Sequence, residues 1–263
     1  EWPSLLLGTV TLRPYVFVFL AFYLTIAILN MGLVRSILFT LLAYTIAFLS
    51  EYSSTRIGFP YGFYEYIETT RDQELWISNV PFMDSLSYSF LAYVAYTVAL
   101  FMWSPLKVNR WDIRLIESAR VRKSLRVVLS GAIFFMLMDV IIDPIAFQGD
   151  RWFLGKIYTY KEQGEYFNIP LTNFFGWLLV GTCILYSFTR LDGYLDQKLP
   201  YKEQKFPAQA LLGPALYFGV LLFNLAVTFY IGEWALGACG TSLTLMLFWL
   251  LYQKIRYPKR FLL

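Results

Sequence analysis

The chain has 263 residues, of which 58% are hydrophobic, 20% are aromatic and only 15% are charged, and its net charge is +4. A soluble domain carries charge on about a quarter of its residues, so this composition excludes an ordinary soluble enzyme and indicates an integral membrane protein. The chain has no histidine, which excludes His-ligated zinc, His-ligated haem, histidine-cluster di-iron centres and nucleophiles activated by histidine. It begins Glu1-Trp2-Pro3, without an initiator Met or a basic-then-apolar leader, so we expect a trimmed sequence.

Long apolar segments follow one another along the whole chain. They predict an all-α polytopic membrane protein with about seven transmembrane helices, in which residues 1–263 form a single transmembrane domain. Most of the segments can cross a hydrocarbon core of about 30 Å at 1.5 Å per residue. The second is short, and we expect its helix to continue past Glu51. The predicted spans are residues 15–33, 36–50, 81–104, 124–142, 170–188, 208–231 and 234–252.

The basic residues predict how the protein is oriented. Sixteen of the 22 Lys and Arg residues fall on one side of this arrangement, and six fall on the other. Because cytoplasmic loops carry the excess of Lys and Arg, we expect the N-terminus outside and the C-terminus in the cytoplasm. Loops 51–80 and 143–169 then both lie outside, where we expect them to form the site. We expect the protein in the plasma membrane of the cell, and topology explains its basic clusters without any nucleic-acid partner.

The acidic residues of the outer half fall into two groups. A solvated surface explains Glu68, Asp72, Glu74, Asp150, Glu162 and Glu165. Four other acids lie within apolar helices or at their ends, where an ionisable group is costly and is therefore a candidate for function. These four are Glu51, Asp84, Asp139 and Asp143.

Asp139 and Asp143 are the strongest candidates. Their spacing of four residues places both carboxyl groups on one face of a helix that we expect Pro144 to end. The helix dipole, the apolar surroundings and the second carboxyl all oppose ionisation, so we expect at least one of the two acids to be protonated near neutral pH. That state suits a general acid. The structural alternative is an ion pair with Arg56, Arg71 or Arg151.

Three further polar residues lie at helix ends near this pair. Glu51 ends the second helix at the same membrane face. Asp84 lies in the first turn of the third helix, where it fits a helix-start role as well as a site role. Asn173 lies in the first turn of the helix that starts near Pro170, either as a cap or as a ligand for water.

Aromatic residues surround these acids in the sequence. In the stretch RIGFPYGFYEY, residues 56–66, the Gly and Pro residues predict a turn from which Tyr61, Tyr64 and Tyr66 project beside Glu65. An interfacial tyrosine belt is the structural alternative. The second outer loop and the helix after it add Trp152, Phe153, Tyr158, Tyr160, Tyr166, Phe167, Phe174, Phe175 and Trp177. Aromatic faces stabilise cations without attacking them, so an acid beside them could protonate an alkene and shelter the carbocation.

Three stretches resemble the CruF-type carotenoid hydratase family. They are GFPYGFYEY at 58–66, the DP pair at 143–144 and YFNIPLTNFFGW at 166–177. The last is similar to that family's aromatic-aromatic-Gly-x-Pro-Leu-x-Asn-Phe-x-Gly-Trp signature, with Asn168 at the position of the Gly. The resemblance implies addition of water to the terminal double bond of an acyclic carotenoid end, which gives a tertiary alcohol. It implies a polyene, water and membrane lipid as partners, and no metal or other cofactor.

Resemblance and residue chemistry together give a set of expected roles. We expect catalysis from Asp139, Asp143, Glu51 and Asn173. We expect substrate binding by Tyr61, Tyr64, Glu65, Tyr66, Asp84, Trp152, Phe174 and Trp177.

Two other functions use the same acids. A carotenoid or isoprenoid end-group cyclase begins with the same protonation and captures the cation with an internal alkene. A proton-coupled transporter is a member of a different class, but such a protein usually has an internal repeat and interrupted helices, and the sequence has no evident repeat. A retinal-binding photoreceptor is disfavoured, because Lys254 lies at the cytoplasmic end of the last helix and not in mid-membrane.

Overall fold

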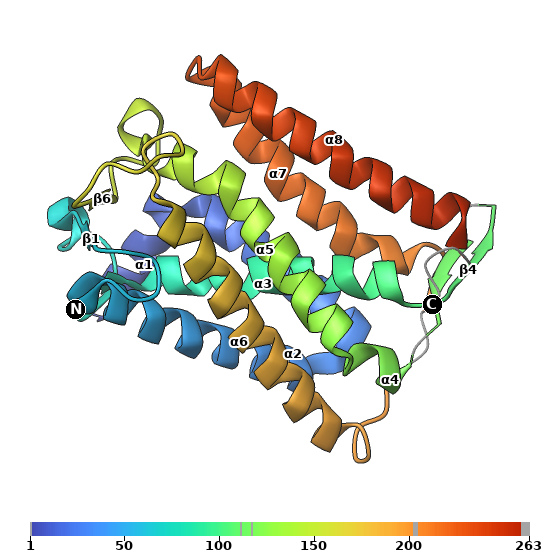
Figure 1. The fold of residues 1–263 in the computed structure, drawn as a ribbon. Helices are drawn as coiled ribbons and strands as arrows, with labels where there is room; N and C mark the ends of the chain where they lie inside the picture. Colours follow the sequence, from blue (N-terminus) through green and yellow to red (C-terminus); the bar gives the residue numbers. More distant parts are fainter. Residues whose placement is uncertain (1, 111, 117, 202–204, 259–263) are drawn as a thin grey trace.

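A computed structural model describes residues 2–110, 112–116, 118–201 and 205–258 (Figure 1). The protein is an all-α polytopic membrane protein, as the sequence predicts. Its helices are α1 (Trp2–Leu12), α2 (Pro14–Ile57), α3 (Phe82–Trp103), α4 (Ala119–Arg122), α5 (Leu125–Ala146), α6 (Leu171–Leu195), α7 (Leu212–Tyr230) and α8 (Trp234–Arg256). In the described part of the chain, six of them are long and apolar enough to span a membrane, namely α2, α3, α5, α6, α7 and α8.

Helix α2 is two antiparallel segments joined at Gly32. Its 44 residues would extend about 66 Å as a straight helix, roughly twice the thickness of a hydrocarbon core. Gly32 has φ 81° and ψ 166°, which is not helical. The hydroxyl of Tyr23 lies 2.8 Å from Oγ1 of Thr40, and residues so far apart in sequence meet only if the chain folds back. Counting both halves gives seven apolar segments within the described residues, in agreement with the predicted number.

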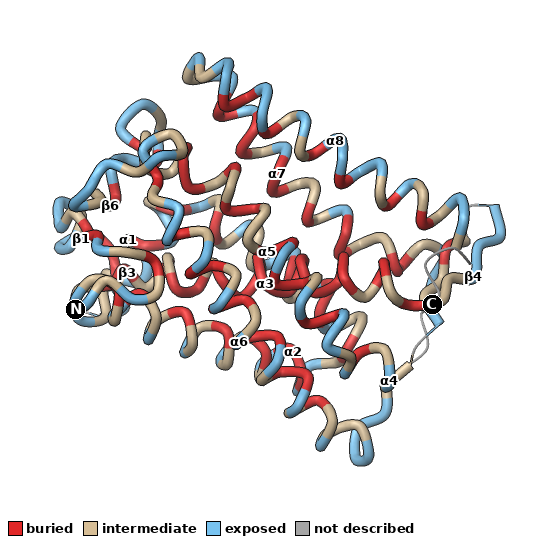
Figure 2. The backbone as a smooth tube through the Cα atoms, viewed as in Figure 1, coloured by how far each residue is buried: buried red, intermediate tan, exposed pale blue. Residues whose placement is uncertain are grey.

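Helix α3 lies at the centre of the bundle. In its most apolar stretch 89% of the residues are buried, against 33% for α8, and Figure 2 shows this contrast along the two helices. Helix α3 packs against α2, α5 and α7, whereas α8 packs mainly against α7. The residues that reach the interior from α3 are therefore surrounded on all sides by protein.

The two ends of the bundle carry different short strands. At one end, where the chain begins, β1 (Tyr64–Tyr66) pairs antiparallel with β6 (Tyr158–Tyr160) (Figure 1). The hairpin of β4 (Leu106–Asn109) and β5 (Asp112–Leu115) lies at the opposite end, where α8 finishes. The pair β2 (Trp76–Ile77) and β3 (Val80–Pro81) precedes α3. Because the chain crosses the bundle an odd number of times, it begins at one end and finishes at the other. The assignment of the β1/β6 end to the outside stays a prediction.

Helix ends agree with the predictions at α2 and α6 but not at α5. Helix α2 continues past Glu51 to Ile57, and Gly58 ends it in the left-handed conformation with φ 76°. Helix α6 starts directly after Pro170. The expected end of α5 at Pro144 is wrong, because the helix continues to Ala146. A proline so close to the end of a helix removes a single hydrogen bond, and the N–H of Phe147 still reaches the Asp143 carbonyl at 2.8 Å.

Buried ion pairs connect sequence-distant segments at both ends of the bundle. At the β4/β5 end, Nε of Arg35 lies 2.5 Å from Oδ1 of Asp192, and Nε of Arg122 lies 3.2 Å from its Oδ2. At the β1/β6 end, Nη2 of Arg13 lies 3.0 Å from Oε1 of Glu74. The solvated position expected for Glu74 is wrong, since only 1% of this residue is exposed. The segment before α3 is therefore held to the chain's first turn by charge as well as by packing.

Candidate active site

A cavity of about 130 Å³ lies among α2, α3, α5, α6, α7 and the β1/β6 sheet. All four acids singled out from the sequence line it, namely Glu51, Asp84, Asp139 and Asp143, together with Asn173. Each lies within about two turns of the helix terminus at the β1/β6 end. The ends of α2, α3, α5 and α6 meet there, so residues far apart in sequence share one enclosed space.

Asn173 bridges the two aspartates of α5. Its side-chain nitrogen donates to Oδ2 of Asp139 at 2.7 Å and to Oδ2 of Asp143 at 3.0 Å. Pro170, not Asn173, occupies the N-cap position of α6, so the capping alternative is wrong. Both N–H groups of the amide are used by the carboxyls, and Asn173 therefore fixes the position of the pair.

Asp143 receives two further hydrogen bonds from strand β6. The Tyr158 hydroxyl donates to its Oδ1 and the Tyr160 hydroxyl donates to its Oδ2, the latter at 3.1 Å. Burial, and then the charge of Asp143, raise the pKa of the Tyr158 and Tyr160 phenols well above the usual range, so both stay protonated donors. Three donors on one carboxyl group stabilise its ionised form.

Asp139 is different. It is fully buried, and its Oδ1 has no hydrogen-bond partner among the described residues. A buried charge without partners is costly, whereas a neutral carboxylic acid is tolerated at far lower cost. The unequal hydrogen bonding favours the proton on Asp139 and the negative charge on Asp143.

None of the three arginines considered as partners reaches these aspartates. Arg56 donates to Oδ1 of Asn79 at 2.7 Å. Arg71 pairs with Glu68, and Arg151 pairs with Glu233. The alternative of an ion pair between the aspartates and Arg56, Arg71 or Arg151 is therefore wrong.

Glu51 and Asp84 form a second group of acids in the same cavity. The Ser85 hydroxyl donates to Oε2 of Glu51 at 2.5 Å. Asp84 lies in the first turn of α3, as expected, and accepts a hydrogen bond from the Tyr66 hydroxyl. Its partner comes from β1, so Asp84 connects the helix to the strand that covers the cavity.

Aromatic rings form most of the remaining surface. The predicted residues Tyr61, Tyr64, Tyr66 and Trp177 all line the cavity, and Trp177 stacks on Tyr88 with ring centroids 4.6 Å apart. Burial is the largest cause that raises the pKa of the Tyr61, Tyr64 and Tyr66 phenols well above the usual range, so these rings carry no charge. The acids thus face neutral aromatic surfaces.

Two predicted site residues lie elsewhere. Glu65 is exposed, because side chains alternate along a strand and its neighbours Tyr64 and Tyr66 take the inner face. Phe174 does not line the cavity but packs on Tyr166, with ring centroids 5.5 Å apart. Asn173 and Trp177, four residues apart, share the helix face that points inward. Trp152 is at the edge of the cavity, where its Nε1 donates to the Ile145 carbonyl at 3.0 Å.

The structure adds cavity residues that the sequence did not single out. They are Tyr15 on α2, Tyr88 on α3, and Phe223 and Asn224 on α7, while Tyr158 and Tyr160 of β6, named from the sequence only as aromatic loop residues, also line the cavity. A Tyr-x-Tyr pattern occurs at residues 64–66 and again at 158–160, and the two copies pair residue by residue. That repeat is a signal that could have identified β6; the residues of α7 carry no comparable signal.

The turn that carries Tyr61 docks closely on α6. A methyl group on Gly176 would lie 2.4 Å from the Tyr61 ring and 2.9 Å from the Pro60 carbonyl oxygen. Only glycine permits such an approach of backbone and ring. The absence of a side chain at Gly176 therefore allows the Tyr61 ring to take its position in the cavity.

Residues 6–247 match the family model described as carotenoid biosynthesis protein. The chain belongs to the carotenoid biosynthesis protein family. No curated protein and no solved structure matches this family member. Within the described residues of this carotenoid biosynthesis protein, no group of three or more His, Cys, Asp or Glu side chains has the arrangement of a metal site.

Membership of this family places the protein in carotenoid biosynthesis. Its helices can span a membrane, and they surround a cavity that is lined by aromatic rings and four acids.

Proposed function

We propose that the protein is a cofactor-independent hydratase that adds water to the terminal double bond of an acyclic carotenoid end. The observation that carries the proposal is the unequal pair of Asp139 and Asp143 inside an aromatic cavity. Oδ1 of Asp139 has no hydrogen-bond partner among the described residues, and Asp143 accepts three hydrogen bonds. Membership of the carotenoid biosynthesis protein family supports the substrate class.

The first step is protonation of the alkene by Asp139. The carboxylic acid transfers its proton to the less substituted carbon of the terminal double bond, and the π electrons form the new C–H bond. The other carbon becomes a tertiary cation. The faces of Trp177 and its stacked neighbour Tyr88 lie in the same cavity and stabilise positive charge. General acid catalysis of this kind contributes about 10²- to 10⁴-fold to a rate.

The second step is capture of the cation by water. The oxygen of a water molecule bonds to the tertiary carbon, and its surplus proton passes to the carboxylate of Asp143, the base of the pair. Transfer of this proton to Asp139 restores the starting state. The net change is addition of one H and one OH, which gives a tertiary alcohol. Asn173 holds both carboxyls throughout and acts as a positioning residue.

The polar groups of the cavity favour hydration over cyclisation. A cyclase has to keep water away from its cation, because water captures a carbocation before an internal alkene can do so. Here Glu51, Asp84 and Ser87 line the same cavity as the aspartate pair. Buried water molecules bind where several polar groups converge, and this cavity offers such groups beside the apolar ones.

Product analysis tests the proposal. The protein is co-expressed with a pathway that makes an acyclic carotenoid, and the pigments are analysed by mass spectrometry. A mass gain of one water per reacted end is expected. An isomer of unchanged mass would identify a cyclase, and unaltered pigment would contradict both.

A matched pair of variants applies the same Asp→Asn substitution at a cavity residue and at a control residue. Asp139→Asn removes the proton donor and is expected to abolish the product, whereas Asp72→Asn changes an exposed residue that lines neither the cavity nor a neighbouring pocket and is expected to leave it unaffected.

A further inference from the structure

The cavity is too small for a whole carotenoid. Its volume is about 130 Å³, and a cavity of roughly 150 Å³ holds one benzene molecule. An extended polyene is comparable in length to the hydrocarbon core of about 30 Å. If the proposed function holds, only the reacting end fits inside, and the remainder of the chain must pass out through one side of the cavity.

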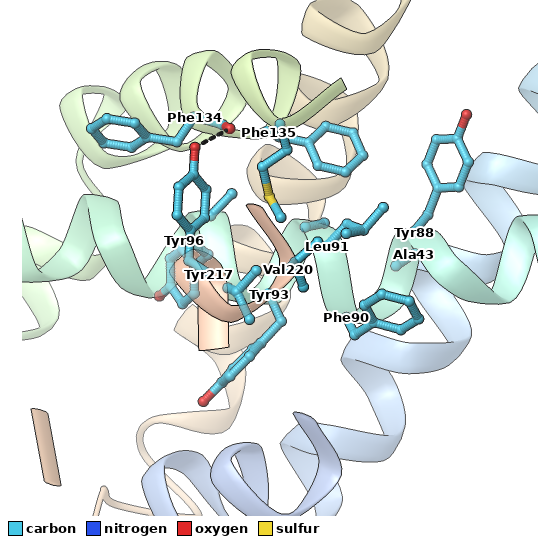
Figure 3. Close-up of a cluster of buried hydrophobic side chains, with 14 of the residues drawn as sticks. Ala43, Tyr88, Phe90, Leu91, Tyr93, Tyr96, Phe134, Phe135, Tyr217 and Val220 are labelled. Carbon is cyan, nitrogen blue, oxygen red and sulfur yellow. Dashed lines mark hydrogen bonds between the residues drawn. The ribbon is translucent and has the colours of Figure 1, made fainter. Parts of the chain in front are cut away.

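Most sides of the cavity are closed by close packing. Toward the middle of the bundle lie the buried side chains of Phe90, Leu91 and Val220 (Figure 3). In the upper part of the same view the Tyr217 hydroxyl donates to the Phe134 carbonyl at 2.9 Å, which joins α7 to α5. On the α6 side, Trp177 packs against Phe135 with ring centroids 4.6 Å apart. A long chain has no path through these sides without disrupting the core.

The side between α2 and α7 is built differently. It consists of four rings, here called the aromatic gate, from Tyr15, Phe19, Trp152 and Phe223, and all four are partly exposed. Phe223 stacks on Tyr15 at 5.8 Å between centroids and meets Phe19 edge-on at 5.7 Å. The ring centroid of Trp152, the fourth residue of the gate, lies 6.5 Å from that of Tyr15 and 6.4 Å from that of Phe223. Rotation of the Tyr15, Phe19 and Phe223 side chains opens the contact among these rings, whereas Trp152 is held in place by the hydrogen bond from its Nε1 to the Ile145 carbonyl.

A surface groove begins on the outer side of the gate. Trp152 and Phe223 line this groove as well as the cavity, and Phe153, Ala226, Val227 and Tyr230 extend it. Positions 223, 226, 227 and 230 form one face of α7. Phe153 and Tyr230 are 62% and 81% exposed. Asp150 and Arg151 lie at one side of the groove, and the remaining lining residues form an open, largely apolar surface that continues the cavity.

We propose that the aromatic gate is the lateral entrance of the active site, and that the unreacted part of the polyene lies in the groove along α7 while its end group is in the cavity. The occupant is an apolar, extended hydrocarbon chain. The groove carries an apolar face, and it shares two rings with a cavity that holds only one end of such a molecule.

A reversible cross-link across the gate tests this proposal. Cys183 and Cys239 are first replaced by Ser, since both are exposed thiols. Tyr15→Cys and Phe223→Cys are then joined by a short bis-methanethiosulfonate reagent. The matched control joins Phe218→Cys to Phe248→Cys, whose rings are 5.8 Å apart between α7 and α8, away from the cavity. Each protein is incubated in phosphatidylcholine vesicles containing lycopene, purified, and assayed for retained lycopene by absorbance and for alcohol by mass spectrometry.

The gate cross-link is expected to reduce lycopene retention to background and to abolish the product, and a reducing agent is expected to restore retention. The α7–α8 cross-link is expected to change neither. Equal retention with the gate closed would overturn the lateral entrance, and so would an absence of retention in the reduced protein. A reduced protein that retains lycopene and forms no alcohol contradicts the hydratase proposal alone, and its retention still tests the gate.

Discussion

The side-chain nitrogen of Asn173 lies 2.7 Å from Oδ2 of Asp139 and joins α6 to α5 inside the cavity. The same amide also holds Asp143. A loop of more than twenty residues separates the two helices in sequence, so this contact exists only because the helices pack side by side. It keeps the two carboxyls close together although their proximity is unfavourable when both are charged.

Replacing this amide is expected to slow the reaction without weakening substrate binding. Asn173→Leu keeps the side-chain volume and removes both donated hydrogen bonds. Hydrogen bonds to charged groups contribute about 1.5–3 kcal/mol, which corresponds to a decrease in kcat of roughly 10- to 100-fold. Kinetics with a purified acyclic carotenoid measure this, and KM is expected to change little. An unchanged kcat would show that Asn173 does not position the pair.

Removing either phenol hydroxyl of β6 is expected to lower the reaction rate. Tyr158→Phe and Tyr160→Phe each remove one donor to Asp143, while Tyr166→Phe alters a ring outside the cavity and serves as control. Loss of one donor to an ionised group costs about 1.5–3 kcal/mol, so each cavity variant is expected to lose roughly tenfold or more in rate. Equal rates in all three variants would remove Asp143 from the mechanism.

A methyl group on Gly176 is expected to disturb the turn that carries Tyr61. Gly176→Ala places a Cβ 2.4 Å from the Tyr61 ring, whereas Gly219→Ala, on another spanning helix, meets nothing within 4 Å. Overpacking costs about 1–3 kcal/mol. Thermal unfolding in detergent is expected to show a lower transition temperature for Gly176→Ala alone, with a matching loss of product. A stable and active Gly176→Ala protein would mean that the turn can move away from α6 freely.

The buried charges at the opposite end are expected to matter for stability and not for chemistry. Asp192→Asn leaves Arg35 and Arg122 with Asp196 as a remaining carboxylate partner. Breaking an isolated buried pair costs about 3–5 kcal/mol, so we expect a loss near the lower end of that range. Glu68→Gln disrupts the exposed pair with Arg71 and is expected to cost less than about 1 kcal/mol. Denaturant unfolding in detergent compares the two variants. Similar losses in both would contradict the distinction between buried and exposed pairs.

The predicted orientation can be tested by labelling single cysteines. Lys156→Cys and Lys107→Cys introduce thiols at exposed positions near opposite ends of the bundle, after Cys183 and Cys239 have been replaced by Ser. The excess of basic residues at the β4/β5 end predicts that this end is cytoplasmic. A membrane-impermeant maleimide is expected to label Lys156→Cys in intact cells and Lys107→Cys only after permeabilisation. The reverse pattern would invert the topology.

Several features of the fold follow from local sequence. Runs of apolar residues give the spanning helices, because backbone groups in a membrane must be bonded within the segment. The spacing of Asp139 and Asp143 places them on one helix face whatever the neighbours are. The sequence also contains the alternation that directs Tyr64 and Tyr66 to one side of β1 and Glu65 to the other, although we expected Glu65 in the site.

Other features depend on which helices meet, and single-sequence patterns do not encode that. Asn173 reaches the aspartates only because α6 lies against α5. Glu74 is buried only because Arg13, far away in the chain, comes to face it. Tyr15, Tyr88 and Phe223 look like ordinary apolar-helix residues until α2, α3 and α7 converge.

The membrane class, the number of apolar segments and the candidate acids could therefore be predicted from the sequence, because each depends on residues within one turn or one span. Three properties follow only from the folded structure: which acid accepts several hydrogen bonds, which rings surround the pair, and which side of the cavity consists of partly exposed rings. Those properties arise from contacts between segments far apart along the chain. The energy of each contact depends on a distance between side chains that is set only when the chain folds.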